Sequence, residues 1–282
     1  MKEHKLLWKE DGLKTLDVGP WVLQKYGPLL KYLEMFSTGM KGKWEKRAYV
    51  DLYSGPGVVR IRNTGRLLRG SPLLALGVED TFDKYVFCEE DEESFHALSQ
   101  RIKRDFNHCD VALINGDCNE RIDEIISAIP PYSQTQRVLS FCFADPFSLE
   151  LQFKTIEHLA SRFVDFLVLL ALDMDANRNI ANYMSKRNTK VNLFLGDHSW
   201  RDKWIAYSRT DDSFQRFLAR EFENQMLKLG YERALSGNTI RVTTNDRNLP
   251  LYHLAFFSRH QKGYQFWKEV RKYLSNPTLF DN

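Results

Sequence analysis

The stretch Arg47-Ala-Tyr-Val-Asp-Leu-Tyr-Ser-Gly-Pro-Gly57 predicts a short buried strand that ends in a glycine turn. Asp51 lies four residues before Gly55, the first glycine of this turn. Glycine lets a ligand approach the bare backbone, because no Cβ stands in the way. Backbone amides exposed in such a turn favour the electron-rich groups of a ligand. The stretch therefore predicts a ligand site at the end of the first strand of a sheet.

Length and composition indicate a soluble globular chain. The 282 residues are enough for one large α/β domain or two modest ones, and 43% hydrophobic with 27% charged residues exclude a disordered chain. The longest apolar run, residues 166–172, is far too short to cross a bilayer. The first ten residues lack the apolar core of a signal peptide. We therefore expect a cytoplasmic protein that contacts no membrane.

Cysteine and charge patterns give weaker indications. The four cysteines form no C-x-x-C pair and no cluster with histidine, so we expect no metal site. Cys88 and Cys142 lie inside apolar runs and are interpreted as small core residues. Basic residues outnumber acidic ones over residues 201–272, which is compatible with a nucleic-acid substrate. A solvated helix face is the simpler interpretation of that excess.

Apolar runs alternate with helical patterns through the middle of the chain. Strands are predicted at residues 49–53, 84–88, 111–114, 138–144 and 164–171. The segments between them place apolar residues at helical spacing. Continuous apolar strands separated by helices are typical of a parallel sheet that is covered by helices on both faces.

Other segments flank this alternation. Residues 17–37 predict a helical lead-in, and the arginine-rich residues 58–69 are interpreted as a loop inserted into the glycine turn. Ser71 as N-cap followed by Pro72 predicts a helix start after that loop. Two β segments at 239–244 and 251–257, and a final helix over 264–274, close the chain.

These patterns divide the chain into four segments. They are a helical lead-in (1–46), a ligand-binding Rossmann-like core (47–172), a helical insertion (173–229), and a closing β-hairpin with the last helix (230–282). The closing segment is expected to complete the same domain as the core.

Acidic residues follow three of the predicted strands. They are Glu89, Asp117 after Gly116, and Asp145 before Pro146 and Phe147. The carboxyl ends of parallel strands meet at one edge of a sheet, where ligands of open α/β sheets bind. Glu89 can accept hydrogen bonds from both hydroxyls of a ribose, since a carboxylate offers several acceptor sites. Asp117 can accept from the exocyclic amine of adenine, with Cys118 beside the ring.

Two kinds of cofactor, a dinucleotide and a nucleoside with an amino-acid tail, are considered for this arrangement. A dinucleotide would use the glycine turn and the acid after the next strand equally well. The third glycine of G-x-G-x-x-G is missing, however, and the insertion separates the turn from its helix, whereas a pyrophosphate needs both together. S-adenosylmethionine (SAM) suits the spacing better, because Asp51 and the turn can face its ammonium and carboxylate. The turn residues proposed for this role are Tyr53, Ser54, Gly55, Pro56 and Gly57.

Several motifs resemble the three-Cys-motif partner (TcmP) family. They are Asp51 to Gly57 with Gly70 to Leu73, Phe87 to Asp91, Gly116-Asp117, and Phe143 to Phe147. The resemblance covers most of the chain and implies the fold of class I SAM-dependent methyltransferases. That fold is a seven-stranded, mostly parallel sheet whose final hairpin inserts antiparallel. The resemblance also implies that a separate three-cysteine-motif protein is a partner.

The segment Asp145-Pro-Phe-Ser148 resembles the (Asp/Asn)-Pro-Pro-(Tyr/Phe) motif of amino-group methyltransferases. In that motif the first residue and a backbone carbonyl accept hydrogen bonds from the target amine, and the aromatic ring stacks on the base. This chain lacks the second proline and carries the aromatic residue one position earlier. Asp145, Pro146 and Phe147 are therefore the candidate catalytic residues, and methylation of a nucleic-acid base is one open possibility.

Three functions stay open from the sequence. The first is a SAM-dependent methyltransferase, with nucleic acid among its candidate substrates. The second is a non-catalytic methyltransferase-fold module that binds a partner protein or nucleic acid. The third is an NAD-linked oxidoreductase. The acidic residues also have structural interpretations, because Asp51 and Asp117 can cap backbone amides and Pro146 can fix Asp145 in a turn.

Overall fold

The computed structural model describes residues 5–172, 179–207, 213–235, 239–244 and 250–275. Its larger sheet comprises β2 (Lys46–Asp51), β5 (Lys84–Glu89), β6 (Val111–Asn115), β7 (Val138–Ala144), β8 (Val164–Leu170), β9 (Thr239–Thr243) and β10 (Pro250–Phe257). A smaller sheet comprises β1 (Leu16–Val18), β3 (Val58–Ile61) and β4 (Leu67–Arg69). The helices are α1 (Val22–Met40), α2 (Ser71–Leu76), α3 (Glu92–Asp105), α4 (Ile122–Ala128), α5 (Phe153–Leu159), α7 (Ile180–Met184), α8 (Lys190–Leu195), α9 (Trp200–Tyr207), α10 (Phe214–Lys228) and α11 (Gln261–Ser275).

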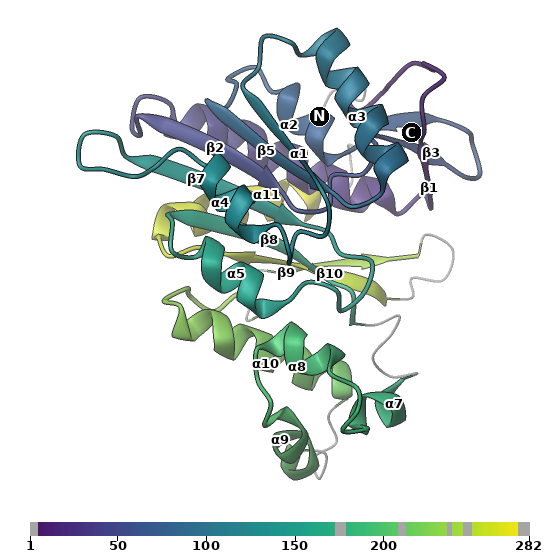
Figure 1. Cartoon of the computed structure of the whole chain (residues 1–282), viewed down its shortest axis with the longest axis vertical. Helices are drawn as coiled ribbons and strands as arrows, with labels where there is room; N and C mark the ends of the chain where they lie inside the picture. The colour runs from purple at the N-terminus through teal and green to yellow at the C-terminus, as the bar shows by residue number, and fades with distance from the viewer. Residues whose placement is uncertain (1–4, 173–178, 208–212, 236–238, 245–249, 276–282) are drawn as a thin grey trace.

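The larger sheet has the strand order β6-β5-β2-β7-β8-β10-β9 (Figure 1). β2 lies at the centre and pairs in parallel with β5 and β7, and β6 and β8 continue the parallel arrangement outward. β10 pairs antiparallel with both β8 and β9. The helical crossovers allow parallel neighbours, whereas the closing hairpin reverses direction. The sheet is therefore the mostly parallel, seven-stranded sheet that the sequence predicts, with the final hairpin inserted antiparallel.

Two buried layers pack against the faces of this sheet. Ala48 and Val50 of β2 belong to a cluster with residues of α4, α5, α8 and α10. Tyr49, between them, belongs to a second cluster with residues of α1, α2, α3 and α11. Successive side chains of a strand point to opposite faces, so a strand buried on both sides needs apolar residues at every position. This requirement explains the continuous apolar runs of the sequence.

Residues 58–69 form a β-hairpin and not the loop that the sequence predicts. β3 pairs antiparallel with β4, and β1 joins β3 in parallel. Val58, Val59 and Ile61 are buried, although arginines alternate with them and suggest a solvated loop. The hairpin also brings its ends together, because the Gly70 amide donates to the Gly57 carbonyl oxygen at 2.7 Å. The glycine turn and the start of α2 are thus separated in sequence but adjacent in space.

Two helix starts differ from the prediction. The lead-in is not helical from Asp17, because β1 occupies residues 16–18 and α1 begins at Val22. α2 begins at Ser71 with Gly70 as its N-cap, so Ser71 is not the cap. The Ser71 hydroxyl forms a hydrogen bond with the Asp51 carboxyl instead. The Ser71 hydroxyl therefore serves the buried Asp51 carboxyl at the end of β2, and it does not cap α2 as the sequence predicts.

The helices α7 to α10 occupy the lower part of the molecule in Figure 1. α8 contacts α5, and α10 contacts α8, so these helices continue the layer that covers one face of the sheet. Trp200 is fully buried there and donates to the Asn192 side-chain oxygen at 3.0 Å, so it is a core residue. The polar run at 173–178 and the reversing loop at 245–249 lie outside the described residues. Of the helices that the structure describes, none is both long and apolar enough to span a bilayer.

Candidate functional site

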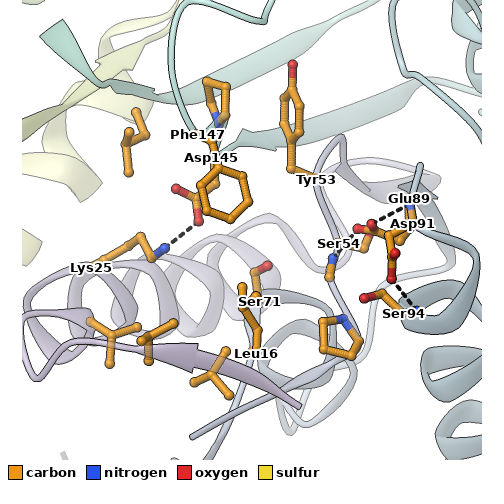
Figure 2. A pocket seen from close by; sticks show the side chains of 18 of the residues that line it. Leu16, Lys25, Tyr53, Ser54, Ser71, Glu89, Asp91, Ser94, Asp145 and Phe147 are labelled. Atoms are coloured by element: carbon orange, nitrogen blue, oxygen red, sulfur yellow. Dashed lines mark hydrogen bonds and ion pairs between the residues drawn. The ribbon is translucent and has the colours of Figure 1, made fainter. Parts of the chain in front are cut away.

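A cavity of about 790 Å³ lies at the carboxyl ends of the central strands. Its wall includes the turns that follow β2, β5, β6 and β7, which is the edge that the sequence predicts for the ligand. Every candidate residue named from the sequence lines this cavity, with the exception of Asp51. The volume falls within the range of about 300–1,000 Å³ that is usual for small-molecule sites. Figure 2 shows the cavity from close by.

The glycine turn forms one wall of the cavity. Gly55 and Gly57 both adopt positive φ angles, of 60° and 84°. A Cβ added to Gly57 would lie 2.8 Å from Leu98 Cδ1, whereas a Cβ added to Gly55 would meet nothing within 4 Å. Gly57 is therefore fixed by packing beneath the turn, and Gly55 presents bare backbone to open space.

Glu89 connects the ends of β2 and β5. Its Oε2 accepts a hydrogen bond from the Gly55 amide at 2.6 Å, and its Oε1 accepts one from the Asp91 amide at 2.9 Å. Burial raises the pKa of Glu89, and the two amide donors oppose this effect. Each carboxylate oxygen keeps a further acceptor site, so Glu89 can still receive the hydroxyls of a ligand.

The turn after β6 places Asp117, Cys118 and Tyr53 on the same wall. Asp117 Oδ1 accepts hydrogen bonds from the amide and the side-chain Nδ2 of Asn119, both at 2.8 Å. Asp117 therefore stabilises its own turn with one oxygen. The Tyr53 hydroxyl is buried beside the Cys118 thiol, and no hydrogen bond of normal geometry satisfies it within the described part of the chain. Burial raises the pKa of the Cys118 thiol to about 12, so this side chain is a neutral, apolar part of the wall.

Asp51 does not reach the cavity wall. It is fully buried and accepts a hydrogen bond from the Tyr49 hydroxyl at 3.0 Å. The alternation of β2 places Asp51 on the same face as Tyr49, where α1 and α2 cover the sheet. Burial raises the pKa of Asp51 to about 7, against the hydrogen bonds from Ser71 and Tyr49. Ser71 and Tyr53 do line the cavity, so Asp51 is linked to the site through the Ser71 hydroxyl and the Tyr53 amide.

Asp145 forms an ion pair with Lys25 of α1, 120 residues away in the sequence. The two side chains are only 16% and 12% exposed, and they point toward each other in Figure 2. Burial disfavours the charge of Lys25, yet the neighbouring Asp145 carboxylate raises the pKa of Lys25 overall. Lys25 is not among the site residues that are predicted from the sequence. One sequence feature could have indicated its burial, because Lys25 lies in helical register with Val22 and Leu29 on the buried stripe of α1.

The cavity has two chemically different parts. Glu89, Asp91 and Ser94 lie on one side of it, and Lys25 with Asp145 lies on the other (Figure 2). Apolar and aromatic side chains surround the Lys25 side, and they come from elements that the sequence does not connect with the site. These residues are Leu16, Val18, Trp21, Tyr26, Leu169 and Tyr252. Phe147 also lines the cavity, and 79% of this residue is exposed.

Arg101 of α3 holds the glycine turn in place. Its guanidinium is fully buried and donates to the Pro56 carbonyl oxygen at 2.5 Å and to the Lys14 carbonyl oxygen at 2.9 Å. It also pairs with Asp11 at 2.7 Å. Although burial opposes the charge, the hydrogen bond from Arg101 holds the pKa of Asp11 well below its usual range. One buried cation therefore joins the N-terminal segment to the glycine turn, a link that sequence spacing does not reveal.

The solved structures that are similar to this chain include some that were determined with SAM or SAH bound. Protein LPL1258 from Legionella pneumophila matches with a TM-score of 0.50 and 13% identity, over 90% of this chain and 92% of that one. An O-methyltransferase from Bacillus cereus, solved with SAH, matches with a TM-score of 0.47 and 12% identity, over 87% and 84%. TYW2 from M. jannaschii, solved with AdoMet, matches with a TM-score of 0.42 and 11% identity, over 90% and 86%. No family model and no curated protein matches the sequence.

The strand order and the antiparallel β10 define the class of fold. Counted along the chain, the seven strands of the larger sheet are arranged 3-2-1-4-5-7-6, with helices on both faces. This is the Rossmann-like fold of class I methyltransferases. Identities this low carry the fold alone, so the chemistry has to be argued from the residues of the cavity.

Proposed function

We propose that this protein is a SAM-dependent methyltransferase. The observation that carries the proposal is the two-part cavity at the carboxyl edge of the sheet. One part offers a carboxylate and bare backbone to a nucleoside with a polar tail. The other part offers an apolar enclosure with a single buried ion pair to a second molecule. A transferase needs a site for the donor of the group and a site for its acceptor next to each other.

The polar part fits SAM in three respects. Glu89 has acceptor sites left for the ribose hydroxyls. Asp117 Oδ2 makes no hydrogen bond among the described residues and is available for the adenine amine. The turn from Tyr53 to Gly57 offers its backbone to the methionine end. When bound, SAM supplies a methyl group on a sulfonium sulfur.

The acceptor belongs in the apolar part, between Lys25 and Phe147. Such a reaction depends mainly on holding the nucleophile in line with the methyl group, which requires little acid–base assistance. The exposed Phe147 ring is available to stack on a planar acceptor, including a nucleic-acid base. Asp145, Pro146 and Phe147 therefore stay the candidate catalytic residues, and Lys25 joins them as the partner of Asp145.

We also propose that the chain is a TcmP family member with a three-cysteine-motif protein as its partner. The motifs that carry this resemblance surround one cavity, which supports a shared function for them. We also propose the division of the chain into lead-in (1–46), core (47–172), helical insertion (173–229) and closing segment (230–282) that the sequence predicts.

A non-catalytic module is the second candidate, and the ion pair of Asp145 favours it. In the amino-methyltransferase motif the aspartate accepts from the substrate, whereas Asp145 already accepts from Lys25. A protein of this kind would bind its partner or nucleic acid without turnover. Two arguments from the sequence speak against an NAD-linked oxidoreductase. The missing third glycine of G-x-G-x-x-G still holds. The separation of the glycine turn from its helix does not hold, because the Gly70 amide donates to the Gly57 carbonyl oxygen.

Thermal unfolding with SAH, SAM or NAD⁺ at equal concentration separates these functions. A ligand that binds only the folded protein raises the melting temperature. The methyltransferase predicts a shift with SAH and SAM and none with NAD⁺. A shift with NAD⁺ alone would establish the oxidoreductase instead. Nucleic-acid binding that is salt-sensitive and indifferent to SAH would favour the module.

A further inference from the structure

A second cavity, of about 510 Å³, lies at the opposite edge of the larger sheet. Arg137 and Leu139 line it at the start of β7, and Val164 and Asp165 line it at the start of β8. The amino ends of parallel strands face away from their carboxyl ends, so this cavity is remote from the site described above. The proposed methyl transfer makes no use of it.

Aromatic rings line this second cavity, two of them half-buried and one exposed. Trp44, Phe163 and Phe266 line it, and Phe163 is 46% exposed. The Trp44 and Phe163 rings lie 5.9 Å apart, and Tyr132, itself 41% exposed, lies 4.7 Å from Phe163. α5 ends at Leu159, so Phe163 lies beyond the end of the helix. Large rings that stay exposed beside a cavity indicate a surface for binding.

The charge around these rings is positive. The Lys262 ammonium makes no hydrogen bond or ion pair within the described residues, and the Lys43 ammonium donates there only to the uncharged Gly39 carbonyl oxygen, at 2.6 Å. Arg259 likewise donates to backbone carbonyls, whereas Arg137 pairs with Glu45 at 2.9 Å. Three cations of the lining are therefore not neutralised.

One acidic residue, Asp165, lies in this lining. It is only 8% exposed and accepts a hydrogen bond from the Tyr32 hydroxyl at 3.2 Å. A Cβ added to Gly263, in the first turn of α11, would lie 3.1 Å from its Oδ2. The carboxylate thus lies against the positive N-terminal end of α11, which offsets its charge locally. His260 Nδ1 accepts from the Lys262 amide, so its lone pair is occupied as well.

We propose that this second cavity binds a small aromatic carboxylate. The ring packs among Trp44, Phe163 and Phe266, and the carboxylate lies near Lys43 and Lys262. Stacking of the ligand on the Phe163 ring accounts for the exposure of that ring. The unneutralised cations select an anion over a neutral or positive molecule of the same shape. The volume suits a molecule of one or two rings.

Calorimetric titration of the whole chain with three matched probes tests this proposal. The probes are 2-naphthoate, 2-naphthylmethylammonium and cyclohexanecarboxylate. Only 2-naphthoate combines a planar ring with a negative charge, so we expect it to bind at least about tenfold more tightly than the other two. Saturating SAH is expected to leave its affinity unchanged. Equal affinity for the ammonium probe, or no binding of 2-naphthoate, would overturn the proposal.

A matched pair of variants locates the bound probe. Lys262→Met removes an unpaired cation of the cavity, and Lys268→Met removes an exposed lysine of the same helix outside it. We expect about tenfold weaker binding of 2-naphthoate for Lys262→Met and no change for Lys268→Met. Equal losses in both variants would show a non-specific charge effect and contradict the site. Competition by an oligonucleotide would assign the surface to nucleic acid and overturn the proposal too.

Discussion

Asp51 and Asp145 share one buried environment with Lys25. Asp145 adds to the elevated pKa of Asp51, and both carboxyl groups help to keep Lys25 charged. Burial favours the neutral form of a carboxyl, whereas a nearby cation favours the charged form. Asp51 is fully buried and has no direct cation partner among the described residues, so it is suited to hold a proton.

A double-mutant cycle tests the pairing of Lys25 with Asp145. Lys25→Met leaves a mostly buried carboxylate without its cation, and we expect a loss of about 3 kcal/mol in the free energy of unfolding. Asp145→Asn should also destabilise the protein. The double variant should lose less than the sum by at least about 1 kcal/mol, because the two residues interact. Urea unfolding measures all four proteins, and additive losses would contradict the pair.

Asp51 predicts a pH dependence of stability with a definite sign. The pKa of Asp51 is about 7 in the folded protein, above its ordinary value of 3.8. The contribution of Asp51 to stability is therefore complete below about pH 4 and is lost as the pH rises toward 7. Over this window the wild type should lose up to about 4 kcal/mol relative to Asp51→Asn. Urea unfolding at a series of pH values measures the difference, and parallel curves would refute the prediction.

The glycine turn shows what a single element demands of its residues. Arg101 fixes the carbonyl of Pro56, and the hairpin β3–β4 returns Gly70 to the carbonyl of Gly57. Both glycines have positive φ, but only Gly57 has neighbours at the position of a Cβ. The backbone conformation therefore favours glycine at both Gly55 and Gly57, and packing excludes a side chain only at Gly57.

Gly55→Ala and Gly57→Ala separate these two constraints. A left-handed conformation costs a residue with a side chain roughly 1–2 kcal/mol, which both variants should lose. Gly57→Ala should lose at least about 1 kcal/mol more, because its methyl group meets Leu98 and Leu73 in the core. The midpoints of denaturant unfolding give both values. A greater loss for Gly55→Ala would contradict the packing at this turn.

The elements differ in how well the sequence predicts them. β7 runs from Val138 to Ala144, as predicted, because an apolar run between breakers has one good interpretation. The hairpin at 58–69 is not predicted, since its arginines conceal the buried valines. Asp51 is predicted as a wall residue because sequence gives its distance from Gly55 but not the face of the strand that it occupies.

At the scale of the molecule, the site consists of a predictable part and an unpredictable part. The residues that follow β2, β5, β6 and β7 meet because parallel strands end at one edge, a rule that sequence alone can apply. The apolar part is built by α1, the small sheet, β8 and β10, and these elements meet there only through tertiary packing. The places of Lys25 and Tyr252 in the cavity wall could therefore be recognised only in the structure.

The central claim is that Glu89 and the glycine turn bind SAM. Calorimetric titration with SAH compares the wild type with Glu89→Ala and with Glu120→Ala, an exposed acidic residue outside the cavity. We predict binding by the wild type and by Glu120→Ala, and at least about tenfold weaker binding by Glu89→Ala, which loses the hydrogen bonds to the ribose. Absence of SAH binding by the wild type, or equal binding by all three proteins, would contradict the account.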